Sequence, residues 1–93
     1  MGHAKLRPKL LAEKLIQIRE ALGLSQRGIA ERLAQRAGVE ITYKNISKYE
    51  QKGVPPMEVV LAYARAGKVQ MESIIDDEVS VEKFRKQLHS NIH

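Results

Sequence analysis

The sequence has no cysteine, no tryptophan, and only one phenylalanine and three tyrosines in 93 residues. Without cysteine, disulfide bonds and thiolate metal sites are excluded, and with so few aromatic side chains the core has to be aliphatic. No apolar run approaches the roughly 18 residues of a membrane span. The basic N-terminus also lacks the uninterrupted apolar stretch and the cleavage site of a signal peptide. We therefore expect a cytoplasmic protein without a membrane segment.

Patterns typical of catalysis and metal binding are also missing. The three histidines, His3, His89 and His93, lie near the chain ends, and only the last two are spaced like ligands on one helical face. No Ser/His/Asp arrangement, phosphate-binding glycine loop or pair of catalytic carboxylates can be assembled. The sequence therefore predicts no metal site, no cofactor and no enzymatic activity.

The charge is unevenly distributed along the chain. The net charge is +5, and residues 1–53 contribute +6 while residues 54–93 contribute −1. A basic half of the chain beside a nearly neutral half favours a protein with one face that binds a polyanion. A surface charge that only keeps the protein in solution is the alternative.

Apolar residues recur at helical spacing along most of the chain, and turn residues separate the segments. Pro8 suits the first turn of a helix, Ser25 and Thr42 suit N-cap positions, and Gly38 and Gly67 suit helix ends. The sequence therefore predicts an all-α protein. It should be a compact bundle of four to five short helices, with helices at 8–22, 26–36, 43–51, 56–66 and 70–76.

The tail, residues 77–93, follows a first domain that we place at 1–76. Val81, Phe84 and Leu88 have the spacing of a short amphipathic helix, whereas Val79 and Val81 alternate with Ser80 as in a strand. The helix is the preferred interpretation. Its apolar stripe would either pack back on the bundle or form a dimer interface together with segment 70–76.

Segment 43–51 is polar and carries a basic face. Ile46 and Tyr49, three residues apart, form its inward edge. The side chains left for solvent or a ligand are Tyr43, Lys44, Asn45, Ser47 and Lys48. The DNA major groove, about 12 Å wide, accepts one α-helix of this kind. The alternative is that this face of the helix is only solvated and binds no ligand.

An ordered set of motifs carries a family resemblance. The set consists of Leu24-Ser25-Gln26, Ile29-Ala30, Ile46-Ser47-Lys48-Tyr49-Glu50 and Pro56. With these motifs, roughly residues 10–76 resemble the phage-repressor (Cro-type, XRE) helix-turn-helix family. The resemblance implies a prokaryotic or phage transcriptional regulator, such as a repressor, that binds a double-stranded DNA operator as a homodimer. Segment 26–36 would cross the DNA backbone, and segment 43–51 would enter the major groove.

The resemblance also assigns roles to individual residues. By match to the family, the candidates for base contacts are Tyr43, Lys44, Asn45 and Lys48. The candidates for backbone contacts are Gln26, Arg27, Ser47 and Lys52. Arg19 and Glu50 match a structural ion pair between the first and third helices. Asparagine can pair with adenine through two hydrogen bonds, and lysine can donate to guanine O6 and N7.

The turn before segment 43–51 departs from the family pattern. Twelve residues separate Leu33 from Ile46, about six more than in the compact form of the family. Either the second helix is longer, or the turn is looped out.

Two other functions fit the same residues. An antitoxin would use these DNA-binding helices and would hold its toxin, a protein partner, with the tail. A helical protein-interaction module would keep the fold without binding DNA. The absence of acidic residues between Ile41 and Tyr49 disfavours the second alternative.

Overall fold

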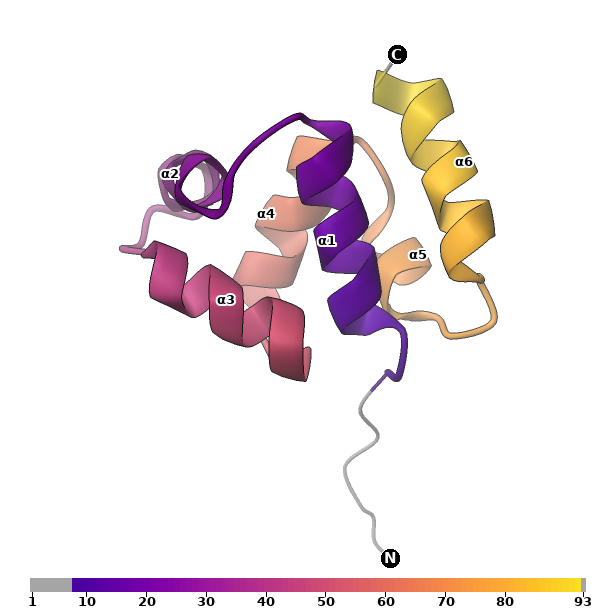
Figure 1. Cartoon of the computed structure of the whole chain (residues 1–93), viewed down its shortest axis with the longest axis horizontal. Coiled ribbons are helices and arrows are strands. Elements are labelled where there is room, and N and C mark those ends of the chain that lie inside the picture. Colours follow the sequence, from indigo (N-terminus) through magenta and orange to yellow (C-terminus); the bar gives the residue numbers. More distant parts are fainter. Residues whose placement is uncertain (1–7, 93) are drawn as a thin grey trace, which may run out of the picture.

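The computed structural model describes residues 8–92, and this part of the chain folds into six helices without a strand (Figure 1). The helices are α1 (Leu11–Ala21), α2 (Gln26–Ala37), α3 (Tyr43–Lys52), α4 (Met57–Gly67), α5 (Met71–Ile75) and α6 (Val81–Ile92). The predicted all-α bundle is confirmed, including the helix in the tail. None of the six is both long enough and apolar enough to cross a lipid bilayer.

Local hydrogen bonds explain where α2 and α3 begin. The Ser25 hydroxyl accepts the backbone N–H of Gly28 at 3.0 Å, so Ser25 is the N-cap of α2. Thr42 caps α3 in the same way by accepting the N–H of Asn45. Both caps satisfy N–H groups that a helix leaves without an internal partner. Both predicted N-caps are thus confirmed.

The start of α1 differs from the prediction. Pro8 lies outside the helix, which begins at Leu11. The reason is a cap from a distant segment, because the carboxylate of Asp77 accepts the N–H groups of Lys9 and Leu10 at 2.8 and 3.1 Å. Asp77 lies in the α5–α6 connection, so nothing near Pro8 in the sequence indicates this boundary.

The core is aliphatic except for two aromatic rings. Tyr63 of α4 and Phe84 of α6 are both fully buried. Gly67 was expected to stop α4, but it is the last helical residue, and Lys68 ends the helix with a φ of 58°. A Cβ on Gly67 would lie 3.1 Å from Leu88 and 3.3 Å from Ile18, so the glycine permits close packing of α4 against α1 and α6.

Helix α6 closes the bundle on the side away from α3 (Figure 1). Its stripe residues Phe84 and Leu88 have no exposed surface, and Val81 is half-buried. The helix contacts α1 and α4. The stripe therefore packs on the bundle, and Phe84 and Leu88 do not face a second copy of the chain.

The lengthened turn combines the two expected arrangements. Helix α2 continues to Ala37, about one helical turn past Leu33, and Gly38 then ends it in the left-handed conformation with a φ of 70°. The remaining residues form a short loop in which Ile41 is only 8% exposed. Because Ile41 is anchored in the core, the loop delivers α3 against α2 despite the inserted residues.

Candidate nucleic-acid interface

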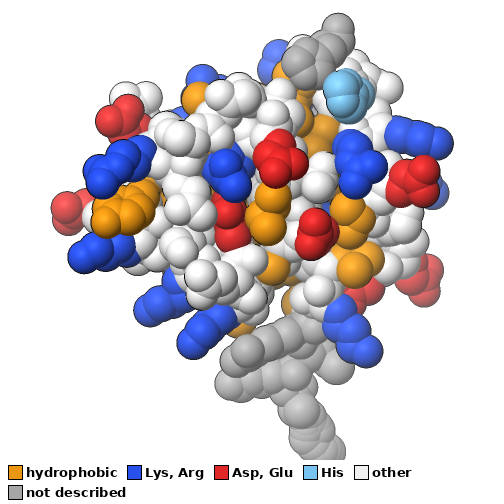
Figure 2. Space-filling model, in the orientation of Figure 1, with side chains coloured by type: hydrophobic (Ala, Val, Ile, Leu, Met, Phe, Trp, Pro, Cys, Tyr) orange, Lys and Arg blue, Asp and Glu red, His pale blue; other side chains and the backbone are white. Residues whose placement is uncertain are grey.

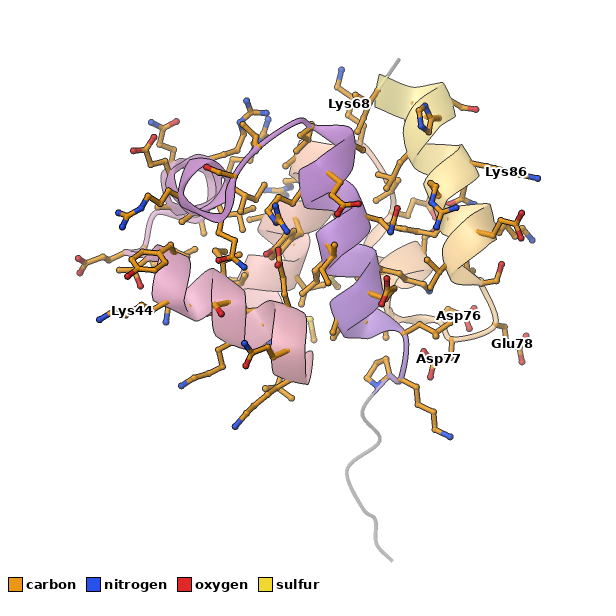
Figure 3. All side chains as sticks on the ribbon, viewed as in Figure 1. Lys44, Lys68, Asp76, Asp77, Glu78 and Lys86 are labelled. Carbon is orange, nitrogen blue, oxygen red and sulfur yellow. The ribbon has the colours of Figure 1, made fainter. Side chains whose placement is uncertain are left out.

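The outer surface of α3 is polar and basic, because the apolar residues of this helix form its inward edge and pack on the core. Ile46 is fully buried and Tyr49 is half-buried. Lys44 and Lys48 are exposed, and neither side chain forms a hydrogen bond or ion pair with any residue between 8 and 92. Figure 3 shows Lys44 pointing away from the bundle at the N-terminal end of α3. Two cationic groups one helical turn apart are thus presented to solvent.

Tyr43 and Arg27 join the N-terminal ends of α3 and α2. The Arg27 guanidinium lies over the Tyr43 ring, 4.2 Å from its centroid, in a cation–π arrangement. Both side chains are exposed, Tyr43 by 37%. A shallow hollow beside them is lined partly by Ile41 and Lys44. The stacking gives Tyr43 a defined orientation at the edge of the α3 surface.

Asn45, a predicted base contact, is engaged in the cap of α3. Its Oδ1 accepts the backbone N–H of Thr42 at 2.9 Å and the Thr42 hydroxyl at 3.1 Å. Thr42 in turn accepts the N–H of Asn45, which completes a capping box. Pairing with adenine through two hydrogen bonds needs Oδ1 as an acceptor. The cap would have to open before Asn45 could make that contact.

Arg19 and Glu50 form an ion pair behind α3. The Arg19 Nε donates to Glu50 Oε2 at 2.6 Å, and Nη2 donates to Oε1 at 3.2 Å. Only 20% of the Arg19 side chain and 6% of the Glu50 side chain are exposed. The hydrogen bond to Glu50 raises the pKa of Arg19. This bidentate pair ties the C-terminal part of α3 to α1.

Gln26, a predicted backbone contact, extends this network to α2. Its Nε2 donates to Glu50 Oε1 at 3.1 Å. One amide hydrogen of Gln26 is therefore used inside the protein, and the second remains for another acceptor. Arg19 also donates to the carbonyl of Leu24 at 3.3 Å. The network thus fixes α1, α2 and α3 relative to one another.

Two residues of this region have no counterpart in the sequence-based set. The buried Tyr63 hydroxyl lies near the ion pair, and among the described residues it has no hydrogen-bond partner. Burial and the Glu50 carboxylate raise its pKa. Gln51 donates to the Ser47 hydroxyl at 3.4 Å on the exposed side of α3. No sequence motif marks either residue, because each role depends on a neighbour brought close by the fold.

The remaining backbone candidates lie on the same side of the molecule. Ser47 is half-buried, whereas Lys52 is exposed at the end of α3. Figure 2 shows Lys and Arg side chains along the edge formed by α3, while basic and acidic side chains alternate elsewhere on this face. The α3 edge is therefore the more positive part of the visible surface.

The described residues hold no group of three side chains suited to bind a metal ion. His3 and His93 lie outside residues 8–92, so the structure does not bear on the His89–His93 pair.

Comparison with known proteins gives one match. A family model described as helix-turn-helix matches residues 15–74, which span α2, α3 and α4 in full and most of α1 and α5. No curated protein and no solved structure matches the chain.

Proposed function

The chain belongs to the Cro-type (XRE) helix-turn-helix family of DNA-binding regulators, and from this premise we propose that it is a sequence-specific transcriptional repressor. It inserts α3 into the major groove of an operator and acts by occupying that site. It works without catalysis, in the cytoplasm of a prokaryotic cell.

One observation carries the proposal: Lys44 and Lys48 project from α3 without a partner among residues 8–92. Because neither lysine forms an ion pair within residues 8–92, both charges are available to an external anion. A DNA duplex supplies one phosphate charge per about 1.7 Å of helix axis, so both ammonium groups can be satisfied there.

The N-terminus of α2 supports the same orientation. Ser25 satisfies the N–H of Gly28, which leaves the earlier N–H groups of Gln26 and Arg27 for a phosphate. The helix dipole and the Arg27 guanidinium add positive charge at this end. These groups position the protein on the backbone while α3 lies in the groove.

We further propose that the protein binds as a homodimer through the exposed stripe of α4. Met57 and Leu61 are two of the five exposed large apolar side chains in the described chain, and they lie four residues apart on one face of α4. Glu58 and Arg65, both exposed, lie equally far from the midpoint between Leu61 and Ala62. Two antiparallel copies of α4 would therefore pair Glu58 with Arg65 of the second copy.

Sedimentation of the full chain tests this interface. Leu61→Glu should shift the protein to a monomer, whereas the control Val39→Glu, at an exposed apolar residue away from α4, should leave association unchanged. A Leu61→Glu variant that associates like the wild type would refute the α4 interface.

Binding to random duplex DNA across a range of salt concentrations tests the main proposal. If Arg27, Lys44, Lys48 and Lys52 each neutralise a phosphate, the logarithm of the binding constant should fall against that of salt with a slope of about −3 to −4 for each subunit that contacts the DNA. Absence of binding at low salt would overturn the proposal and favour the protein-interaction module.

A further inference from the structure

Two exposed lysines of α3, Lys44 and Lys48, offer hydrogen-bond donors only. This feature bears on which operator the protein selects, and the inference rests on the proposed function above. Lysine has three N–H donors and no acceptor. Lys44 and Lys48, which project toward solvent, therefore offer only donors.

Asn45 adds to this imbalance. An amide oxygen has two lone pairs, and both are used by the N–H and the hydroxyl of Thr42. The Thr42 hydroxyl donates to Asn45 Oδ1 and accepts the N–H of Asn45, which leaves it one acceptor lone pair and no donor. What Asn45 leaves for a ligand is its Nδ2 group with two donors.

Some acceptors near this surface are already bound, and others lie beside the lysines. Glu50 is held by Arg19 and Gln26. The Tyr43 hydroxyl belongs to a ring stacked on Arg27 at the N-terminal edge. The free Oε1 of Gln51 and the Ser47 hydroxyl, which accepts from Gln51, both lie within one helical turn of Lys48. At the two lysine positions themselves, the surface presents donors only.

The base pairs differ in what they present to such a surface. Guanine offers two adjacent acceptors, O6 and N7, in the major groove. Adenine N7 and thymine O4 are single acceptors, whereas adenine N6 and cytosine N4 are donors that need an acceptor from the protein. At the positions that the two lysines contact, side chains with donors only therefore favour guanine, which offers two acceptors side by side.

We propose that each operator half-site contains two guanines contacted by Lys44 and Lys48, and that Asn45 is a positioning residue which fixes the start of α3. Four helical residues rise about 6 Å, and base pairs are about 3.4 Å apart. The two guanines are thus about two base-pair steps apart, on the strand or strands that face α3.

Selection of bound duplexes from a random pool by the full chain tests the spacing. Two enriched guanines about two steps apart in each half-site are expected. Replacing either one by 7-deazaguanine, which lacks the N7 acceptor, should weaken binding at least about fivefold. The same replacement elsewhere in the duplex should have no effect.

The outcomes separate this inference from the proposed function. A selected site without such guanines, or full binding to the 7-deazaguanine duplexes, overturns the inference while DNA recognition stands. Lysine contacts made only to phosphates would give that result, because they carry no sequence information. Failure to bind any duplex overturns the proposed function as well.

Variants test the base contacts of Lys44 and Lys48 independently of the positioning role of Asn45. Lys44→Gln and Lys48→Gln should each change the preferred base at one position from guanine to adenine, because glutamine pairs with adenine N6 and N7. Asn45→Ala should lower the melting temperature and weaken all duplexes alike, with base preferences unchanged. Asn45→Asp, which keeps the capping oxygen, should restore the melting temperature. An Asn45→Ala protein that melts normally but loses preference at one base would refute the positioning role.

Discussion

Lysine side chains are used in opposite ways at the two ends of this molecule. Where α1, α5 and α6 meet, Lys14 is fully buried, and its Nζ donates to the carbonyls of Ser73 and Asp76 at 2.8 Å each. The ammonium also lies 5.6 Å from the centre of the Phe84 ring. On α3, Lys44 and Lys48 are exposed and have no partner in the described part of the chain.

The difference shows that burial and partners, rather than residue type, separate a structural cation from one that is available to a ligand. Lys14 donates to the carbonyl of Ser73 in α5, which the short helix leaves without an internal partner, and to the carbonyl of Asp76, which also accepts the N–H of Val79. Burial lowers its pKa, and the nearby Asp77 and Asp76 carboxylates act in the opposite direction. Changes around Lys14 should thus affect folding, and changes at Lys44 or Lys48 should affect binding.

The largest expected effect comes from the ion pair that connects the two ends. Arg19→Ala leaves the largely buried Glu50 carboxylate without its bidentate partner, and we expect a loss of stability on the order of 3 kcal/mol. DNA affinity should fall as well, because α3 loses its tie to α1. Thermal melting and duplex binding measure the two effects. Arg36→Ala, on the exposed side of α2, is the matched control, and an unchanged melting temperature for Arg19→Ala would contradict the structural role.

A smaller effect is expected at the buried lysine. Lys14→Met keeps the side chain's bulk but removes the donor to two carbonyl groups, so stability should fall by about 1–3 kcal/mol. The salt dependence of DNA binding, measured where the variant is folded, should stay the same. A slope reduced by one phosphate contact would show that Lys14 also serves binding, and the comparison would then fail.

The cap on α1 predicts a pH dependence of stability. The hydrogen bonds from the Lys9 and Leu10 N–H groups lower the pKa of Asp77 below its ordinary value of 3.8. The folded state therefore favours the carboxylate. This contribution to stability is complete above the ordinary pKa, and it is lost as the pH falls through the folded pKa.

Melting of Asp77→Asn against pH tests the cap. The variant should melt below the wild type at pH 7, and the gap should narrow as the pH falls through the folded pKa of Asp77, which lies below 3.8. Asp76→Asn would perturb a second contact, so Glu78→Gln is the better control. A gap that persists unchanged in acid would exclude the charged cap.

The smallest effect is expected at Tyr63. Its buried hydroxyl has no hydrogen-bond partner among residues 8–92, so Tyr63→Phe removes a polar group without breaking a contact there. We expect an unchanged or slightly raised melting temperature. A clear loss of stability would reveal a partner that holds this hydroxyl beside the ion pair.

Local patterns were enough to predict much of the fold. Helical spacing and the caps at Ser25 and Thr42 placed the helices correctly, because these signals act within a few residues. The start of α1 was misplaced because its cap, Asp77, lies 67 residues from Leu10 in the sequence. A contact between residues so far apart in the sequence produces no periodic pattern from which it could be predicted.

The candidate site was predictable in position but less so in detail. The exposed lysines of α3 follow from its apolar edge, since Ile46 fixes which face is buried. Asn45 was chosen for its chemistry alone, and the structure shows that the same amide completes a capping box. One side chain can suit both roles by type, and only its hydrogen bonds distinguish them.

The most direct test of the account compares two pairs of exposed lysines. Lys44→Gln with Lys48→Gln changes α3, and Lys83→Gln with Lys86→Gln makes the same charge change on α6. Melting and salt-dependent binding to random duplex DNA are measured for both. We predict unchanged melting for both pairs, with binding weakened and the log–log slope reduced by about two contacts for the α3 pair alone. Equal loss of binding in the two pairs would contradict the claim that α3 carries the DNA-binding surface.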